Sequence, residues 1–143
     1  MSTSVRAAGA DDLGALEPFL PTFLHPLYKR GRFVRALANG EVFIAENVAG
    51  AVGFMWLNEF FGHTFVNVLA VAPEHRRRGH AGLLLAHAGQ HALTDRVFTS
   101  TNASNAAMHA VLARYGWRRC GEVDEIDRGD PEIVYVKYAT AVS

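Results

Sequence analysis

The sequence holds a single cysteine, Cys120, among 143 residues. One thiol cannot form a disulfide within the chain, and it cannot supply a zinc site made of several cysteines. A lone cysteine also fits a reducing compartment. The N-terminal segment has no apolar run of the kind found in signal peptides, and every apolar run is far shorter than a membrane span. We therefore expect a soluble, cytoplasmic protein with no membrane partner.

An excess of charge of either sign is also missing, because 14 lysines and arginines balance 14 aspartates and glutamates. A neutral chain has no overall field that would attract nucleic acid or an anionic membrane. The composition, 50% hydrophobic and 20% charged, is that of a folded globular protein. The length suits one hydrophobic core, so we expect one domain over residues 1–143.

Three common ligand-binding signatures are absent. The chain contains no Gly-Lys-Ser/Thr of a Walker loop and no GxGxxG after an early strand. His87 and His91 have a spacing that zinc sites use, but the residues between them do not make an HExxH motif. We expect no metal site.

The apolar pattern predicts strands that alternate with helices. Hairpins predominate, so we expect an α+β fold with a mixed, mostly antiparallel seven-stranded sheet and about four helices. One parallel crossover is expected, from the fourth strand through a helix to the fifth. The expected strands are 5–7, 41–46, 51–57, 64–71, 96–101, 117–123 and 132–138, and the expected helices are 12–19, 27–38, 79–93 and about 105–115.

Residues 76–82, Arg-Arg-Arg-Gly-His-Ala-Gly, lie between the fourth strand and the following helix. We call this segment the arginine–glycine loop. The first N–H groups of a helix lack internal partners, and the helix dipole places partial positive charge there. Glycine and alanine let an anion approach the backbone, and arginines supply forked donors. The loop therefore predicts a phosphate site, best suited to a diphosphate.

Two other interpretations of the loop are a solvated basic surface loop and a nucleic-acid contact through Arg76–Arg78. A nucleic-acid contact predicts affinity that falls steeply with salt, and the neutral overall charge argues against it.

Two segments carry a resemblance to a known family. Residues 68–85, VLAVAPEHRRRGHAGLLL, resemble the acetyl-CoA signature Q/R-x-x-G-x-G/A of the GNAT superfamily of N-acyltransferases. Residues 105–117, NAAMHAVLARYGW, resemble its second signature, N-x-x-(A/M)-x-x-x-Y-x-x-x-G-F. The expected strand order also matches. The resemblance implies a GNAT-like domain, splayed between its fourth and fifth strands, that transfers the acetyl group of acetyl-CoA to a primary amine by direct attack.

The resemblance implies which residues bind the cosubstrate. The loop N–H groups would hold the CoA diphosphate, and the preceding strand would pair with the pantetheine arm. The thioester carbonyl would accept a hydrogen bond near Leu69. The His80 side chain is expected to face solvent. The implied cofactor-binding set is Leu69, Ala70, Val71, Arg76, Arg77, Arg78, Gly79, His80, Ala81, Gly82, Asn105 and Met108.

The general acid of the family has no clear counterpart. The tyrosine that often protonates the departing thiolate falls at Leu112, which carries no proton to give. Tyr115 lies one turn further along the helix and His109 three residues before Leu112, so either is a candidate, with water as the alternative. Cys120 is expected to be a packed thiol rather than a nucleophile.

Candidate bases are equally open. Glu59 follows a long strand on the expected acceptor side, and the turn acids Asp127, Asp130 and Glu132 are candidates for recognising a cationic substrate. Asn67 is expected to point into the slot. A cluster of aromatic residues is expected to pack in the core, with an acceptor wall or a homodimer face as alternatives: Phe54, Trp56, Phe60, Phe61 and Phe65.

The acceptor class stays open between small amines and protein amines. Leu112 also leaves open a second function, a CoA-binding or regulatory module that has lost catalysis.

Overall fold

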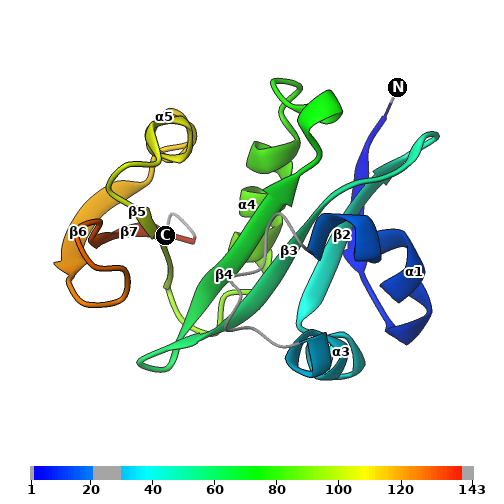
Figure 1. Ribbon diagram of the computed structural model, residues 1–143, viewed down its shortest axis with the longest axis horizontal. Helices are drawn as coiled ribbons and strands as arrows, with labels where there is room; N and C mark the ends of the chain where they lie inside the picture. Colours follow the sequence, from blue (N-terminus) through cyan, green and yellow to red (C-terminus); the bar gives the residue numbers. More distant parts are fainter. Residues whose placement is uncertain (1, 21–29, 140–143) are drawn as a thin grey trace.

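Seven β-strands form one mixed sheet in the computed structural model, which describes residues 2–20 and 30–139 (Figure 1). The strands are β1 Ser4–Ala7, β2 Val42–Asn47, β3 Gly50–Phe60, β4 His63–Val71, β5 Arg96–Asn102, β6 Arg118–Val123 and β7 Glu132–Tyr138. Their order across the sheet is β1-β2-β3-β4-β5-β7-β6, and only the β4–β5 pair is parallel. The predicted α+β fold is confirmed.

The α-helices of the described residues are α1 Leu13–Leu16, α3 Arg30–Ala38, α4 His80–Gln90 and α5 Ala106–Arg114. The helix predicted over 12–19 is divided into α1 and two flanking 3-10 turns, Ala10–Asp12 and Glu17–Phe19. Pro18 explains the end of α1 before the second turn, because it has no N–H to continue the helical hydrogen bonds. Of the helix predicted over 27–38, residues 27–29 lie outside the described residues.

A hydrophobic core lies on each face of the sheet. One core packs α1 and α3 against alternate residues of β2, β3 and β4 and includes Leu16, Phe33, Phe54 and Trp56. The other packs α4 and α5 against the opposite face and includes Leu84, Val97, Leu112 and Tyr135. Alternate side chains of a strand point to opposite faces, so central strands contribute to both cores.

The predicted aromatic cluster divides between the core and the β3–β4 hairpin. Phe54 and Trp56 are buried, and Phe33 contacts both of them edge to face. The ring of Phe60 contacts those of Phe61 and Phe65 near the turn.

Candidate functional site

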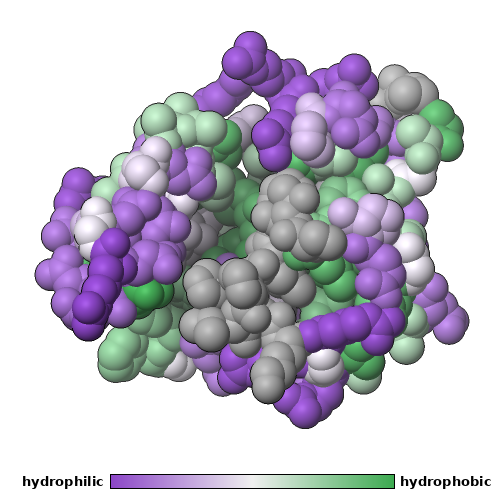
Figure 2. All heavy atoms as spheres, viewed as in Figure 1, coloured by the Kyte–Doolittle hydropathy of each residue, from purple (hydrophilic) through white to green (hydrophobic). Residues whose placement is uncertain are grey.

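The sheet opens between β4 and β5. Their backbones pair only over residues 64–66 of β4 and 97–99 of β5, although β4 continues to Val71 and β5 to Asn102. The ribbons diverge beyond this short parallel pairing (Figure 1). In the same view, apolar residues line a recess between the lobe that carries β5–β7 and the rest of the molecule (Figure 2). The predicted splay between the fourth and fifth strands is confirmed.

The splay begins at a β-bulge. Val68 pairs with Trp56 and Val66 with Leu57, so Asn67 has no opposite residue in β3. Because of the extra residue, side chains two positions apart lie on opposite faces of the sheet. Val66 packs in the α4–α5 core, whereas Val68 packs in the α1–α3 core. The bulge directly follows the last β4–β5 pair.

A side-chain hydrogen bond joins β4 and β5 at the point where their backbone pairing stops. The hydroxyl of Thr99 donates a hydrogen bond of 2.9 Å to the carbonyl oxygen of Val66, its register partner. Thr99 is buried, so this bond is shielded from water. It marks a firm vertex from which the two strands separate.

The edge of β4 beyond the vertex offers backbone groups to the gap. The N–H of Ala72 donates to Val52 at 2.9 Å, toward β3, so by alternation Leu69 and Val71 face the opposite side. The carbonyl of Val71 accepts a hydrogen bond from Arg76 Nε at 3.2 Å on that side. An extended ligand in the gap therefore meets the backbone of Leu69 and Val71.

Ala70, which was grouped with these two residues, is oriented differently. Its side chain is buried in the α1–α3 core. Its carbonyl oxygen points at β3, where a Cβ atom on Gly53 would collide with it. Ala70 supports the strand without presenting its backbone to the gap.

The arginine–glycine loop brings a helix N-terminus to the open end of the gap. Arg77 and Gly79 both have positive φ, 63° and 82°, which turns the chain tightly into α4. Gly79 is the N-cap residue and no side chain caps the helix. The first backbone bond of the helix runs from the N–H of Leu83 to Gly79. The N–H groups of residues 80–82 therefore remain available for an anion, as the phosphate site requires.

The His80 side chain is buried, with 7% of the residue exposed, and the expectation that it faces solvent is wrong. It occupies the first position of α4, where side chains point back toward the N-terminus, here beneath the loop. Its ring centroid lies 6.3 Å from that of His75. Among the described residues, His80 Nε2 and His75 Nδ1 are buried without a hydrogen-bond partner. Burial lowers the pKa of His80, and the charges of His75 and Arg78 lower it further.

This lowered pKa makes a prediction for stability against pH. Below pH 6.5, the ordinary pKa of the group, the unfolded chain takes up a proton at His80 that the folded chain refuses. Unfolding free energy should therefore fall as the pH drops from about 7 to about 5. In His80→Leu this dependence should be weaker, with the remainder owed in part to His87, whose pKa is lowered by burial and by His91. Urea denaturation across that range measures both slopes, and identical slopes would contradict the assignment.

Asn105 joins α5 to β5. Its side-chain oxygen accepts a hydrogen bond from the N–H of Met108 at 3.2 Å, which caps the helix. Its Nδ2 donates to the hydroxyl of Thr101 at 3.0 Å. Met108 is half-buried against the α4–α5 core. The structure thus gives Asn105 a capping role at the start of the helix that flanks the gap.

His109 is held at both ring nitrogens. Nε2 lies 3.0 Å from the carbonyl oxygen of Asn102, which can only accept, so Nε2 carries the hydrogen. Nδ1 then accepts the hydroxyl hydrogen of Tyr135 at 2.6 Å. The pair ties α5 to β7 beneath the helix. Sequence reasoning named His109 but missed Tyr135, which lies far along the chain and in no motif.

Tyr115 spans the space between α5 and α4. It follows the last residue of α5, and its ring lies so close to Gly82 that a Cβ atom there would overlap it. The Tyr115 hydroxyl oxygen would be 2.7 Å from that Cβ. Gly82 is the third residue of α4, so the hydroxyl lies at the first turn of this helix. Leu112, one turn earlier, is fully buried in the core.

The predicted acidic residues do not meet at the gap. Glu59 is exposed on β3 opposite Thr64, on the hairpin side of the vertex. Asp130 accepts hydrogen bonds from the N–H and hydroxyl of Ser104, and Glu132 accepts one from Ser100. Asp127 accepts one from Asn102. The turn acids therefore fasten the β6–β7 turn to the end of β5.

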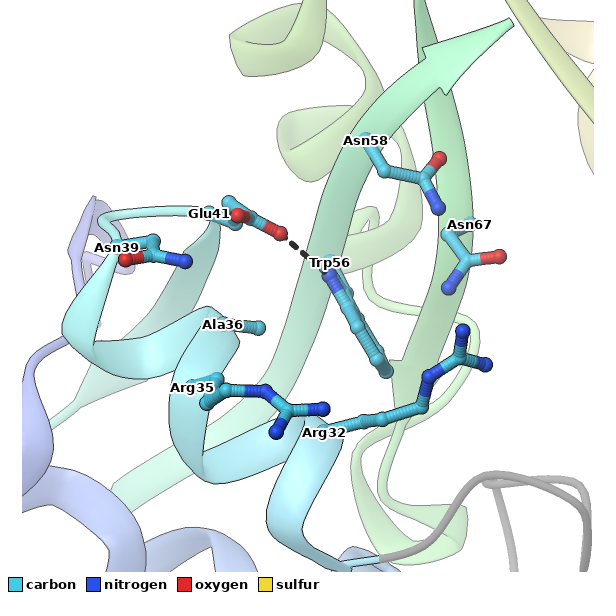
Figure 3. Close-up of a pocket in the computed structure, with 8 residues that line it drawn as sticks. All are labelled: Arg32, Arg35, Ala36, Asn39, Glu41, Trp56, Asn58 and Asn67. Atoms are coloured by element: carbon cyan, nitrogen blue, oxygen red, sulfur yellow. Dashed lines mark hydrogen bonds between the residues drawn. The ribbon is translucent and has the colours of Figure 1, made fainter.

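Sequence reasoning missed a pocket of about 350 Å³ between α3 and the strands (Figure 3). We call it the α3 pocket. Only Asn67 and Trp56 of its lining were named beforehand, because the arginines of α3 belong to no motif. Its lining residues are Arg32, Arg35, Ala36, Asn39, Glu41, Trp56, Asn58 and Asn67.

Cys120 is exposed on β6, so the prediction of a packed thiol is wrong. The strand β6 lies at the sheet edge, on the far side of β7 from the gap. Partial burial of the thiol raises its pKa, which disfavours the nucleophilic thiolate.

Histidine, cysteine and acidic side chains nowhere gather in threes as metal ligands within residues 2–20 and 30–139. His87 and His91 instead contact each other, with their Nε2 atoms 3.1 Å apart. Within these residues, every helix is too short or too polar to span a lipid bilayer.

Comparison with known proteins gives concordant matches. The family profile of the acetyltransferase (GNAT) domain matches residues 38–119. A crystal structure of a GNAT-family acetyltransferase from Bacillus cereus is 31% identical, with 96% of this chain and 98% of that chain covered and a TM-score of 0.87. Arabidopsis thaliana NAA60 in complex with acetyl-CoA shares the fold at 16% identity, with a TM-score of 0.78 over 96% of this chain and 99% of that chain.

A mycothiol acetyltransferase of Kineococcus radiotolerans is 37% identical over 67 residues, which make up 47% of this chain. The match covers 22% of that protein, so the chain spans only a small part of its length.

Proposed function

This chain belongs to the GNAT acetyltransferase family, and from that premise we propose that it is an N-acetyltransferase, which transfers the acetyl group of acetyl-CoA to a primary amine by direct attack. One observation carries the proposal. The open edge of β4 and the uncapped N-terminus of α4 lie at the two ends of one short segment, residues 69–82. This arrangement fits a long ligand with amides along its arm and a diphosphate at its end.

Different segments of the chain bind different parts of acetyl-CoA, the cosubstrate that supplies the activated thioester. The N–H groups of residues 80–82 bind the diphosphate, with Arg77 and Arg78 beside them. The backbone of Leu69 and Val71 binds the amides of the arm. Backbone N–H groups beyond the bulge polarise the carbonyl that the amine attacks.

Two proton transfers accompany the reaction, one from the attacking amine and one to the departing thiolate, and the groups near the gap limit which of them can take part. A lysine-like amine has a pKa of about 10.4 and must lose a proton before it attacks. Glu59 and the turn acids lie elsewhere or are engaged, so water takes this proton in our proposal. Both nitrogens of His109 are occupied. The hydroxyl of Tyr115 lies at the first turn of α4, which is the diphosphate end of the arm, so in our proposal water also protonates the departing thiolate.

Release of free thiol from acetyl-CoA, measured with a panel of small amines and peptides, tests the function. We expect release to require an amine acceptor. Tyr115→Phe should leave kcat within about threefold of the wild-type value, well short of the ~10²–10⁴-fold that a general acid contributes. His109→Gln should lower the unfolding free energy, since it disturbs the hydrogen bond to Tyr135, and should leave kcat nearly unchanged.

Acetyl-CoA binding with no thiol release across the whole panel would contradict the transferase. It would favour the second candidate, a CoA-binding module, which the buried Leu112 at the motif tyrosine position supports.

A further inference from the structure

The α3 pocket has two contrasting walls. Arg32 and Arg35 project from α3 toward the strands, and the amides of Asn58 and Asn67 face them from β3 and β4 (Figure 3). The Trp56 ring lies between the walls, and its Nε1 donates a hydrogen bond to Glu41 at 3.2 Å. The pocket is therefore polar on its sides, with one aromatic ring fixed inside it.

The pocket adjoins the point where the sheet opens. Asn67 is the bulge residue of β4, next to the last β4–β5 pair. Its side chain lines the pocket on the α3 face. The core on the opposite face belongs to α4 and α5. A molecule in the pocket and a thioester in the gap would thus meet at one residue of β4, coming from the two faces of the sheet.

The charges of the pocket favour an anion. Two guanidinium groups lie three residues apart on α3 and hence on one face of the helix. Arg35 forms no ion pair with any described residue of the chain. Glu41 is the one carboxylate among the described lining residues, so the two arginines leave the pocket with a net positive charge. The acids once considered for binding a cation, Asp130 and Glu132, are bonded to serines of the β5–α5 segment.

We propose that the acceptor is a small primary amine that also carries a carboxylate or a phosphate, and that Arg35 and Arg32 bind this anion. The inference rests on the proposed acetyl transfer and identifies the substrate class for it. Guanidinium forks match the oxygens of carboxylate and phosphate groups. With the anion on α3, the amine points to Asn58 and Asn67 and so to the vertex.

Two physical points support this assignment. Nearby positive charge disfavours an ammonium ion, so the arginines help the amine to become the neutral nucleophile. The volume of about 350 Å³ lies at the lower end of small-molecule pockets. The pocket therefore suits a molecule the size of an amino acid better than a long polyamine.

Matched acceptor pairs provide the test. Each pair shares its carbon skeleton and differs in the anion: glycine with glycinamide, β-alanine with its amide, and phosphoethanolamine with ethanolamine. Rates are compared per neutral amine, because the anion also raises the pKa of the amine. We expect kcat/KM of the wild-type protein to favour the anionic member by roughly 10- to 100-fold, because hydrogen bonds to charged groups contribute that much. The carboxylate and phosphate pairs show which anion is preferred.

Substitutions locate the effect. Arg35→Ala and Arg32→Ala should raise KM for the anionic acceptor about tenfold or more and leave KM for acetyl-CoA unchanged. Arg35→Lys should restore part of the preference, since the charge remains. Arg118→Ala is the matched control, because Arg118 is exposed on β6 at the opposite edge of the sheet. Equal rates within each pair, or arginine variants that behave like the control, would overturn the anion site.

Calorimetry with CoA-loaded protein separates this inference from the proposed function. Binding of glycine or phosphoethanolamine that is lost in Arg35→Ala, but without thiol release, would keep the anion site and overturn the transferase. Thiol release with peptides or polyamines in preference to every anionic amine would keep the transferase and overturn the anion site.

Discussion

Replacing Gly79 by glutamate is expected to weaken acetyl-CoA binding by at least about 100-fold while the protein stays folded. Gly79 has φ of 82° and caps α4, and no atom of residues 2–20 or 30–139 lies within 4 Å of the Cβ position. A side chain there strains the backbone by about 1–2 kcal/mol but meets no obstacle. Its carboxylate would compete for the helix N–H groups and repel a diphosphate. Loss of two charge-assisted hydrogen bonds, at about 1.5–3 kcal/mol each, accounts for the factor.

Isothermal titration with acetyl-CoA measures this loss, and Gly62→Glu is the matched control. Gly62 has φ of 83° and the same open surroundings, but it lies in the β3–β4 turn, at the other end of β4. The two variants should lose similar stability, and only Gly79→Glu should lose affinity. A Gly79→Glu protein with normal affinity would show that the arginine–glycine loop does not bind the cosubstrate.

Truncating Leu112 to alanine should lower the unfolding free energy by about 2–5 kcal/mol. Leu112 is fully buried on α5 and packs in the core formed by α4, α5 and the sheet. Removal of its isobutyl group leaves a cavity that surrounding side chains fill only in part. Chemical denaturation measures the change. Leu93→Ala is the control. Leu93 follows α4 and is 62% exposed, so its truncation should change the unfolding free energy little.

Leu112→Tyr tests whether a tyrosine at this position could act as the proton donor for acetyl transfer. The larger ring and its hydroxyl must enter a filled core, so we expect destabilisation of about 1–3 kcal/mol and no gain in the rate of acetyl transfer. A variant that folds as well as the wild-type protein and transfers acetyl faster would show that the side chain reaches the gap.

The sequence predicted the fold well because its signals are local. The apolar alternation of β4, the glycine at residue 79 and the cap at Asn105 each act within a few residues of their position. Hairpins then leave few possible strand orders. The helix over residues 12–19 was overestimated because Pro18 permits only short turns on either side.

The candidate site was predicted unevenly. The loop was found because its backbone geometry follows from glycine placement beside a helix start. The burial of His80 was missed, since whether a loop side chain turns inward depends on what lies beneath it. The α3 pocket was missed because its residues come from three separate elements and no motif links them.

The sequence by itself predicted seven strands in their order along the chain and a glycine-containing turn before α4, and it showed that position 112 carries no tyrosine. These depend on residue type and spacing along one stretch of chain. Only the tertiary structure decided that Tyr115 lies against Gly82 and that His109 bonds Tyr135. It also decided that Arg35 and Asn67 line one pocket. The reason is physical. Contacts between elements depend on the twist of the sheet, on its bulges and on how helices pack against it, and this geometry leaves no pattern in neighbouring residues of the sequence.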